Sequence, residues 1–424
     1  MVQADYEQAM DVLRTGMRSR PGPIGMSRLY MVEAEMESLK GNWVCLSILF
    51  LLYSYSSCKI PLFVFSQGNV VDLCRQAITI SSDMTPGTQE EAKSRGEVEL
   101  AASTLGTRAL LIGTRDAEAF QMAQQCLDIA RKSFAHVGSE DKRWQALVLS
   151  TSVAGLVQHA SCELDSAADS FDNVLSLIES DSGARTALDY LIPDALKQAA
   201  SFSAARGRKE QAVSLGMRSI AAAERRLAMA TNGLDPMLSP IAAEEIVADA
   251  KLLMAQSCMY RSAWEDAEEK LNDALAVVES IVQTTVGSGG QHPYIGMTLL
   301  PLAEVYSRTG RVTLAEGLYR EIAKILGLSP AEDKKGCTAV HPTVNSFVAW
   351  RFSQLLTVLP KRETEATAWK NLSFDIYDDA PLKRLTDPDV MFGSLDRLSG
   401  RGTNGQGVVL DLMTRRALPC AKVG

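Results

Sequence analysis

Apolar residues recur at three- and four-residue steps through most of this chain, a spacing that is typical of amphipathic helices. The clearest stretch is residues 292–328, HPYIGMTLLPLAEVYSRTGRVTLAEGLYREIAKILGL. The apolar stripes of its two halves are formed by Leu302, Ala303, Tyr306, Ala315, Tyr319 and Ile322. Gly310 separates the halves, and a glycine readily adopts the left-handed conformation that ends a helix. The pattern predicts two antiparallel helices joined at Gly310.

The same interval recurs upstream: a small residue, six residues, a turn residue, four residues, an alanine, three residues and a large apolar residue. The turn position of the successive copies falls at Cys162, Gly207, Ser262 and Gly310. In the copy around Gly207, Gly216 and Ser219 replace the expected apolar pair. A looser copy places Ala123, Leu127 and Ala130 in its second helix. Because one helix pair cannot bury its apolar stripe alone, repeated pairs predict a stacked solenoid.

This interval resembles that of the tetratricopeptide repeat (TPR) family, over roughly residues 25–379. The His292–Pro293 opening resembles the longer repeats of kinesin-light-chain-like TPR proteins, and His341–Pro342 opens the next hairpin in the same way. We expect both histidines to cap or pack a turn rather than to bind metal. The resemblance implies an all-α, right-handed α-solenoid of TPR-like antiparallel helix hairpins with a concave inner surface. The family pattern describes packing only, so it implies no catalytic residue.

The repeat pattern divides the chain into four parts. Residues 1–23 are predicted as an N-terminal helix or partial hairpin, and residues 24–330 as a TPR-like repeat array with an apolar insert at 44–67. Residues 331–380 are predicted as a degenerate final hairpin. Residues 381–424 contain a glycine-rich loop and the run VVLDLMTRRAL. We predict that this run forms a capping helix over the apolar end of the solenoid, which terminal repeats need.

The apolar insert interrupts the first repeat. Without Val44–Gln67, the residues Val70, Cys74 and Ala77 fall at the spacing of a second helix. One hypothesis is a translated intron that preserves the reading frame. Val44-Cys45 can be encoded by GTATGT, a common start of an intron, and Gln67 by CAG, a common intron end. A tolerated loop or extra helix and a membrane span through 44–65 are the alternatives. A lysine and a proline interrupt that span, and spanning would separate the two helices of one hairpin.

Composition and charge narrow the functional classes. The formal net charge of −8 disfavours nucleic-acid binding, which needs a basic face. Eight scattered cysteines without a C-x-x-C pair indicate reduced thiols and a cytoplasmic location, or an organelle if the true N-terminus lies upstream. The four histidines show no metal-ligand spacing, and no phosphate-binding glycine motif is present. We therefore predict no catalytic residue, no metal site and no cofactor, and thus no enzyme.

The repeat register also predicts which residues face the concave surface. These candidates for partner binding are His159, Lys197, Gln256, Met259, Glu304 and Ser307. Lys197 is the only clear cation among them, and Asp249 lies where a clamp for acidic chaperone tails would need a base. The predicted concave surface mixes polar and apolar residues, which instead favours an extended peptide or a helix as ligand. We predict a non-catalytic protein–protein interaction scaffold or adaptor; a membrane-anchored TPR adaptor through 44–65 and a regulatory subunit of an enzyme complex are the alternatives.

Overall fold

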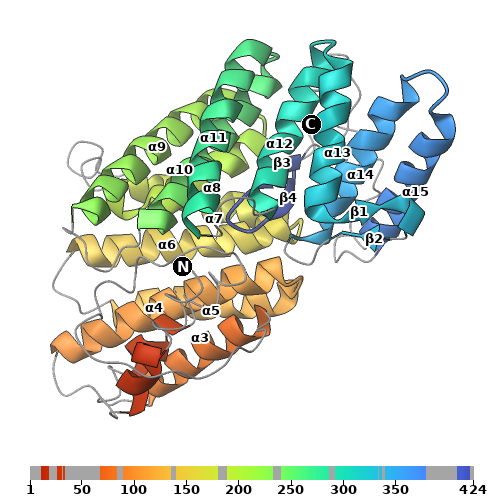
Figure 1. Ribbon diagram of the computed structural model, residues 1–424. Helices are drawn as coiled ribbons and strands as arrows, with labels where there is room; N and C mark the ends of the chain where they lie inside the picture. Colours follow the sequence, from red (N-terminus) through yellow and green to blue (C-terminus); the bar gives the residue numbers. More distant parts are fainter. Residues whose placement is uncertain are drawn as a thin grey trace.

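The computed structural model describes residues 11–18, 26–30, 32–33, 67–83, 89–134, 140–179, 189–232, 240–285, 292–332, 334–336, 340–378 and 408–420. These residues form an array of helices with two short two-stranded sheets (Figure 1). The all-α prediction is confirmed. In the described ranges no helix is both long and apolar enough to cross a membrane. Residues 44–66 of the insert lie outside the described residues, so the three interpretations of it stay hypotheses.

The helices pair in chain order. The pairs are α4 (Gln89–Ile112) with α5 (Asp116–Ser133), α6 (Glu140–Ala160) with α7 (Leu164–Glu179), α8 (Pro193–Ala205) with α9 (Lys209–Thr231), α10 (Pro240–Tyr260) with α11 (Trp264–Thr285), α12 (Pro293–Arg308) with α13 (Val312–Leu326), and α14 (Pro342–Thr357) with α15 (Glu363–Asp378). Before them, α3 (Gln67–Ser82) packs on α4, and residues 11–18, 26–30 and 32–33 are helical. The predicted stripe of α3 is confirmed, because Val70, Cys74 and Ala77 are all buried.

The strands are few and short. β1 (Leu328–Ser329) and β2 (Lys334–Lys335) pair antiparallel around the short helix η3 (Pro330–Glu332). β3 (Val408–Asp411) and β4 (Arg416–Pro419) form a second antiparallel pair, in which Leu410 lies opposite Ala417. We call residues 408–420 the C-terminal hairpin.

The turns between paired helices share one backbone geometry. A residue with positive φ lies at each turn, namely Thr114 (61°), Cys162 (61°), Gly207 (72°), Ser262 (57°), Gly310 (78°) and Lys361 (63°). At Gly310 the next residue closes the turn, since Arg311 N donates to Tyr306 O at 2.9 Å, as in a Schellman motif. The residue five positions after each turn is a buried alanine: Ala119, Ala167, Ala212, Ala267, Ala315 and Ala366. The predicted TPR-like interval is therefore confirmed.

The structure corrects the predicted register of one repeat, in α5, and explains the missing large apolar residue of another, in α9. In α5 the buried residues are Ala119, Met122, Ala123, Cys126, Ile129 and Ala130. The predicted Ala123 and Ala130 are thus buried, but Leu127 is half-exposed, and the alanine five residues after the turn is Ala119. The looser repeat was thus placed one helical turn too late, because alanines four residues apart fit either register. In α9, a side chain on Gly216 would place its Cβ 2.7 Å from Met254 Sδ. The neighbouring methionine therefore fills the space that a large apolar residue occupies in the other copies.

Two glycines, Gly310 in a turn and Gly317 inside α13, allow a matched prediction of stability. We expect Gly310→Ala to destabilise the protein by about 1 kcal/mol, because φ at this position is +78° and an L side chain is strained there. Gly317→Ala should instead stabilise it by about 0.5–1 kcal/mol, because this glycine lies inside α13 with open space around its Cβ position. Urea unfolding of the two variants would measure the difference. Equal effects would contradict the assigned turn.

The first helices of successive hairpins form the inner layer of the array. Contacts run from α4 to α6, then to α8, α10, α12 and α14. The C-terminal hairpin packs against this layer, since β3 contacts α8 and α10 while β4 contacts α6 and α14 (Figure 1). The predicted capping helix in VVLDLMTRRAL is therefore wrong. Apolar residues that face both ways suit a strand buried on both faces better than a helix that covers one end.

Candidate functional site

The six predicted concave-surface residues lie on α6, α8, α10 and α12. His159, Lys197 and Gln256 bind the C-terminal hairpin directly. Met259 and Glu304 line a pocket that β3 closes with Val408 and Leu410. Ser307 is half-buried near the end of α12. We call the surface that holds the hairpin the inner groove. A role of these residues toward another protein stays a prediction.

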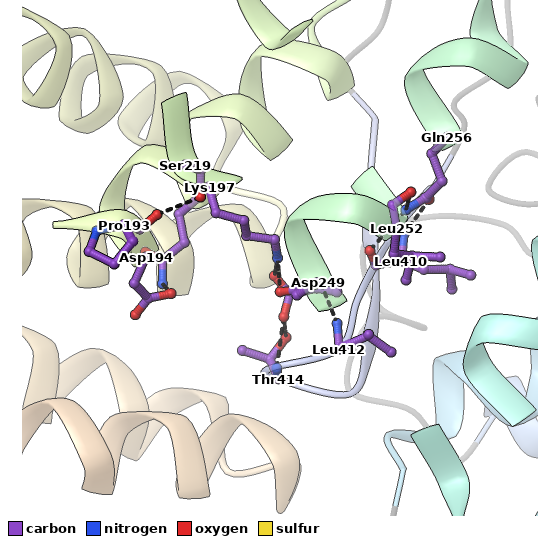
Figure 2. Close-up of polar contacts among 12 residues, drawn as sticks. Pro193, Asp194, Lys197, Ser219, Asp249, Leu252, Gln256, Leu410, Leu412 and Thr414 are labelled. Carbon is purple, nitrogen blue, oxygen red and sulfur yellow. Dashed lines mark hydrogen bonds and ion pairs between the residues drawn. The ribbon is translucent and has the colours of Figure 1, made fainter. Parts of the chain in front are cut away.

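Side chains from one face of α10 satisfy the free edge of strand β3. Asp249, Gln256 and Tyr260 are separated by seven and four residues, so they project from the same side of the helix. Their contacts are Tyr260 Oη to Val408 O (3.1 Å), Gln256 Oε1 to Leu410 N (2.8 Å), Gln256 Nε2 to Leu410 O (3.2 Å) and Asp249 Oδ1 to Leu412 N (2.9 Å). Figure 2 shows the last three. The helix thus pairs with the strand edge as a neighbouring strand would.

The edge of β4 is bound from the other side of the groove. The contacts are His341 N to Arg415 O (2.9 Å), Ala417 N to Thr343 Oγ1 (3.3 Å) and His159 Nε2 to Pro419 O (2.7 Å). Burial lowers the pKa of His159 to about 4, so its ring is neutral near pH 7. Because a carbonyl oxygen only accepts, the Nε2 atom of His159 carries the proton. Both outer edges of the hairpin are therefore held through backbone groups.

A buried charge cluster joins α8, α10 and the hairpin. The ammonium of Lys197 contacts the carboxylate of Asp249 (Figure 2) and the carboxylate of Asp411. Each of the three side chains is at most 1% exposed. Asp411 also accepts hydrogen bonds from Thr414 N (2.7 Å) and Oγ1 (2.8 Å), which close the hairpin turn.

The cluster determines the protonation of its members. Burial opposes the charge of Lys197, but the two carboxylates outweigh burial and raise its pKa. Burial likewise opposes ionisation of Asp411, but Lys197 and Thr414 lower its pKa overall. Burial and the charge of Asp411 raise the pKa of Asp249. Lys197 and Asp411 therefore form the ion pair of the cluster, and Asp249 is the carboxylate that protonates first on acidification.

Two neighbouring arginines of the hairpin, Arg415 in the turn and Arg416 at the start of β4, are also buried. Arg416 donates to both carboxylate oxygens of Asp116 at the start of α5 (2.8 and 2.9 Å) and to Nε2 of His341 (2.7 Å). Such a bidentate arginine–carboxylate pair is directional and strong. The guanidinium of Arg415 lies 5.2 Å from the ring centre of Tyr294. The hairpin thus carries a carboxylate toward Lys197 and a guanidinium toward Asp116.

Apolar side chains of the hairpin join three parts of the core. Val408, Leu410, Leu412 and Ala417 pack with residues of α10 to α15. Val409 and Cys420 pack with α6 to α9, and Leu418 packs with α3 to α6. As one result, every residue of α8 is buried, although α8 belongs to the inner layer. The groove is filled by this segment.

Sequence reasoning missed several residues of the groove, among them Asp116, Tyr260 and Thr343. It named Asp249 only as an acid that disfavours a chaperone-tail clamp, whereas Asp249 binds Lys197 and the hairpin backbone. A usable signal was present, because Lys197 and Asp249 are charged residues at inner positions of largely apolar helices. In the described part of the chain, no group of three or more His, Cys, Asp or Glu residues is arranged to hold a metal.

The pKa of a neighbouring acid predicts a pH dependence of stability. Burial raises the pKa of Glu245 to about 7, against the effects of Arg415 and of Tyr294 Oη, which donates to Glu245 at 3.2 Å. As pH rises from about 4.5 to 7, the unfolded chain releases this proton first, so the folded protein loses stability. We expect the stability of Glu245→Gln relative to the wild type to rise by roughly 2–3 kcal/mol over that range.

Urea unfolding at pH 5, 6, 7 and 8 would measure this trend, with the exposed Glu321→Gln as the control. A relative stability of Glu245→Gln that stays constant with pH, or that falls toward pH 8, would contradict the raised pKa.

Comparisons with known proteins concern the repeat architecture. No protein-family model and no curated protein matches the sequence. Among solved structures, BtubC (BKLC) from P. vanneervenii is similar at 17% identity, covering 63% of this chain and 91% of that chain with a TM-score of 0.38. Putative kinesin light chain TPR-like repeats from Podosopora anserina match at 17% identity over 53% and 94%, with a TM-score of 0.30. The TPR-like character of this chain rests on its own intervals, turns and helix packing.

Proposed function

We propose that this protein is a non-catalytic interaction scaffold, located in the cytoplasm, that binds an extended segment of a partner protein in its inner groove. One observation carries the proposal: the groove already binds an extended segment of the same chain. Gln256 recognises both backbone groups of Leu410, a contact that any residue except proline could make at that position. Recognition of a strand edge through its backbone is a recurrent way of binding peptides.

The concave candidates divide the work of binding. The side chains of His159 and Gln256 form hydrogen bonds with the backbone of the bound segment. The ammonium of Lys197 supplies the charge that selects an acidic residue. Met259 and Glu304 supply the pocket beside the bound strand. Ser307 lies farther along α12, where a longer ligand would reach.

Site-specific photo-crosslinking in the cells that make the protein tests this proposal. A diazirine amino acid replaces Met259, in the groove, or Met217, which is 61% exposed on α9. We expect Met259 variants to crosslink one recurring partner and Met217 variants to crosslink none or unrelated proteins. Equal crosslinking from both positions, or a recurring partner from Met217 alone, would contradict a groove-binding scaffold.

A further inference from the structure

We propose that the C-terminal hairpin is an internal competitor of the partner, so that the inner groove binds a partner's two-stranded β-hairpin only after its own hairpin has left. The inference deepens the proposed function, on which it rests. It specifies the ligand as a β-hairpin with an acidic residue before its turn and an arginine after it.

The first support is the way in which the hairpin is attached. An isolated two-stranded hairpin is marginally stable in water, so this one depends on the groove for its structure. Side chains of the solenoid bind its outer edges on both strands, through Gln256, Tyr260 and Asp249 on β3 and through His159 and Thr343 on β4. Both edges of a hairpin are matched at once, which a single strand or a helix would not satisfy.

The second support is the charge inside the groove. A permanent core segment gains most from apolar contacts, because the desolvation of buried ion pairs offsets most of their attraction. This segment makes apolar contacts as well, but it also binds through two ion pairs, Lys197–Asp411 and Asp116–Arg416. Charge pairs of this kind select one ligand against others. They therefore indicate that the groove recognises a particular sequence pattern. The pattern is an acidic residue, a turn of four residues and an arginine, and in the hairpin it runs from Asp411 to Arg416.

The third support is that the groove retains a charge partner when the hairpin leaves. Lys197 also contacts Asp249, which belongs to α10 and not to the hairpin. An emptied groove thus keeps one ammonium beside one carboxylate, and water can reach both. The carboxylate of Asp116 lies at the start of α5 and is 14% exposed even in the closed state. Release of the hairpin leaves no isolated charge in an apolar core.

Tethering makes the competition strong. Residues 379–407 link α15 to β3, so the hairpin is present at a high effective concentration. Such a link raises apparent affinity by about 10²–10⁴ over the same segment added as a free peptide. A free hairpin peptide should therefore bind poorly until the link is cut.

Cutting the link in the full-length protein tests the inference. A protease site is placed in GRGTNGQG (400–407), and the probe is a fluorescent peptide of residues 405–424. We expect the cut protein to bind this peptide at least 100-fold more tightly than the uncut protein. Two results would overturn the inference: equal binding to both forms, or a cut protein that neither releases its own fragment nor exchanges it for the probe over a day.

Changes in the peptide avoid any effect on folding of the solenoid. We expect peptides with Asp411→Asn or Arg416→Gln to bind the cut protein at least 10-fold more weakly than the original, and a scrambled peptide not to bind. Unchanged binding of both variants would contradict the proposed pattern. Crosslinking from Met259 separates this inference from the proposed function. A partner that crosslinks there in uncut protein without displacing the hairpin would support the proposed scaffold function and contradict the inference that the hairpin competes with the partner. Peptide exchange without any crosslinked partner would support the exchange of the hairpin and contradict the scaffold function.

Discussion

Replacing Lys197 with methionine should destabilise the protein by about 3–5 kcal/mol. The substitution removes the only ammonium that contacts Asp249 and Asp411 among the described residues, and both carboxylates are at most 1% exposed. Removing one member of a buried charge pair is costly because the remaining charge keeps its desolvation penalty. Methionine fills a similar space, so lost packing contributes little. Urea unfolding near pH 7 would measure the loss.

Two comparisons make this result specific to the charge cluster. Lys132→Met removes a lysine whose side chain is 80% exposed and lies 3.8 Å from Asp128, and we expect a change below about 0.5 kcal/mol. Adding Asp249→Asn and Asp411→Asn to Lys197→Met should recover a large part of the loss, because no charged member of the cluster remains. A single variant that loses less than about 1 kcal/mol, or a triple variant without recovery, would argue against the cluster.

The repeats could be predicted from the sequence because their determinants are local. A positive-φ residue, a buried alanine five residues later and a stripe of period 3.6 are all written within one helix pair. Cys162 and Ser262 show this well, since neither is glycine and both adopt a φ near +60° at the predicted position. Interval carried more information than residue type. Where alanines four residues apart fitted two registers, as in α5, the prediction shifted by one turn.

The inner groove could be predicted only in part, because its ligand comes from far along the chain. The register placed His159, Lys197 and Gln256 on the inner layer, but their hydrogen-bond partners lie more than 150 residues away. The run VVLDLMTRRAL is apolar over a short length, and such runs do not distinguish a helix from a strand buried on both faces. This run forms two strands because residues of α10 and α14 supply the hydrogen bonds that the edges of the strands need.

Removing the C-terminal hairpin should lower stability without unfolding the solenoid. A chain that ends at residue 400 loses five large apolar side chains from three parts of the core, Val408, Val409, Leu410, Leu412 and Leu418. That loss is offset by the ordering entropy of the segment, so we expect a melting temperature about 5–10 °C lower. The helical circular dichroism signal per residue should equal that of the full-length protein, since each repeat is stabilised by its neighbours. Binding of a hydrophobic dye should appear as α8 becomes exposed.

A chain that lacks only residues 421–424 keeps the whole hairpin and is the matched control, for which we expect no change in melting temperature or dye binding. Adding the peptide of residues 405–424 to the shorter chain should restore the melting temperature and remove the dye signal, because the same hydrogen bonds and ion pairs form in trans. A shorter chain that loses its helical signal would mean that the hairpin is required for folding. A shorter chain with an unchanged melting temperature would mean that the groove does not need an occupant.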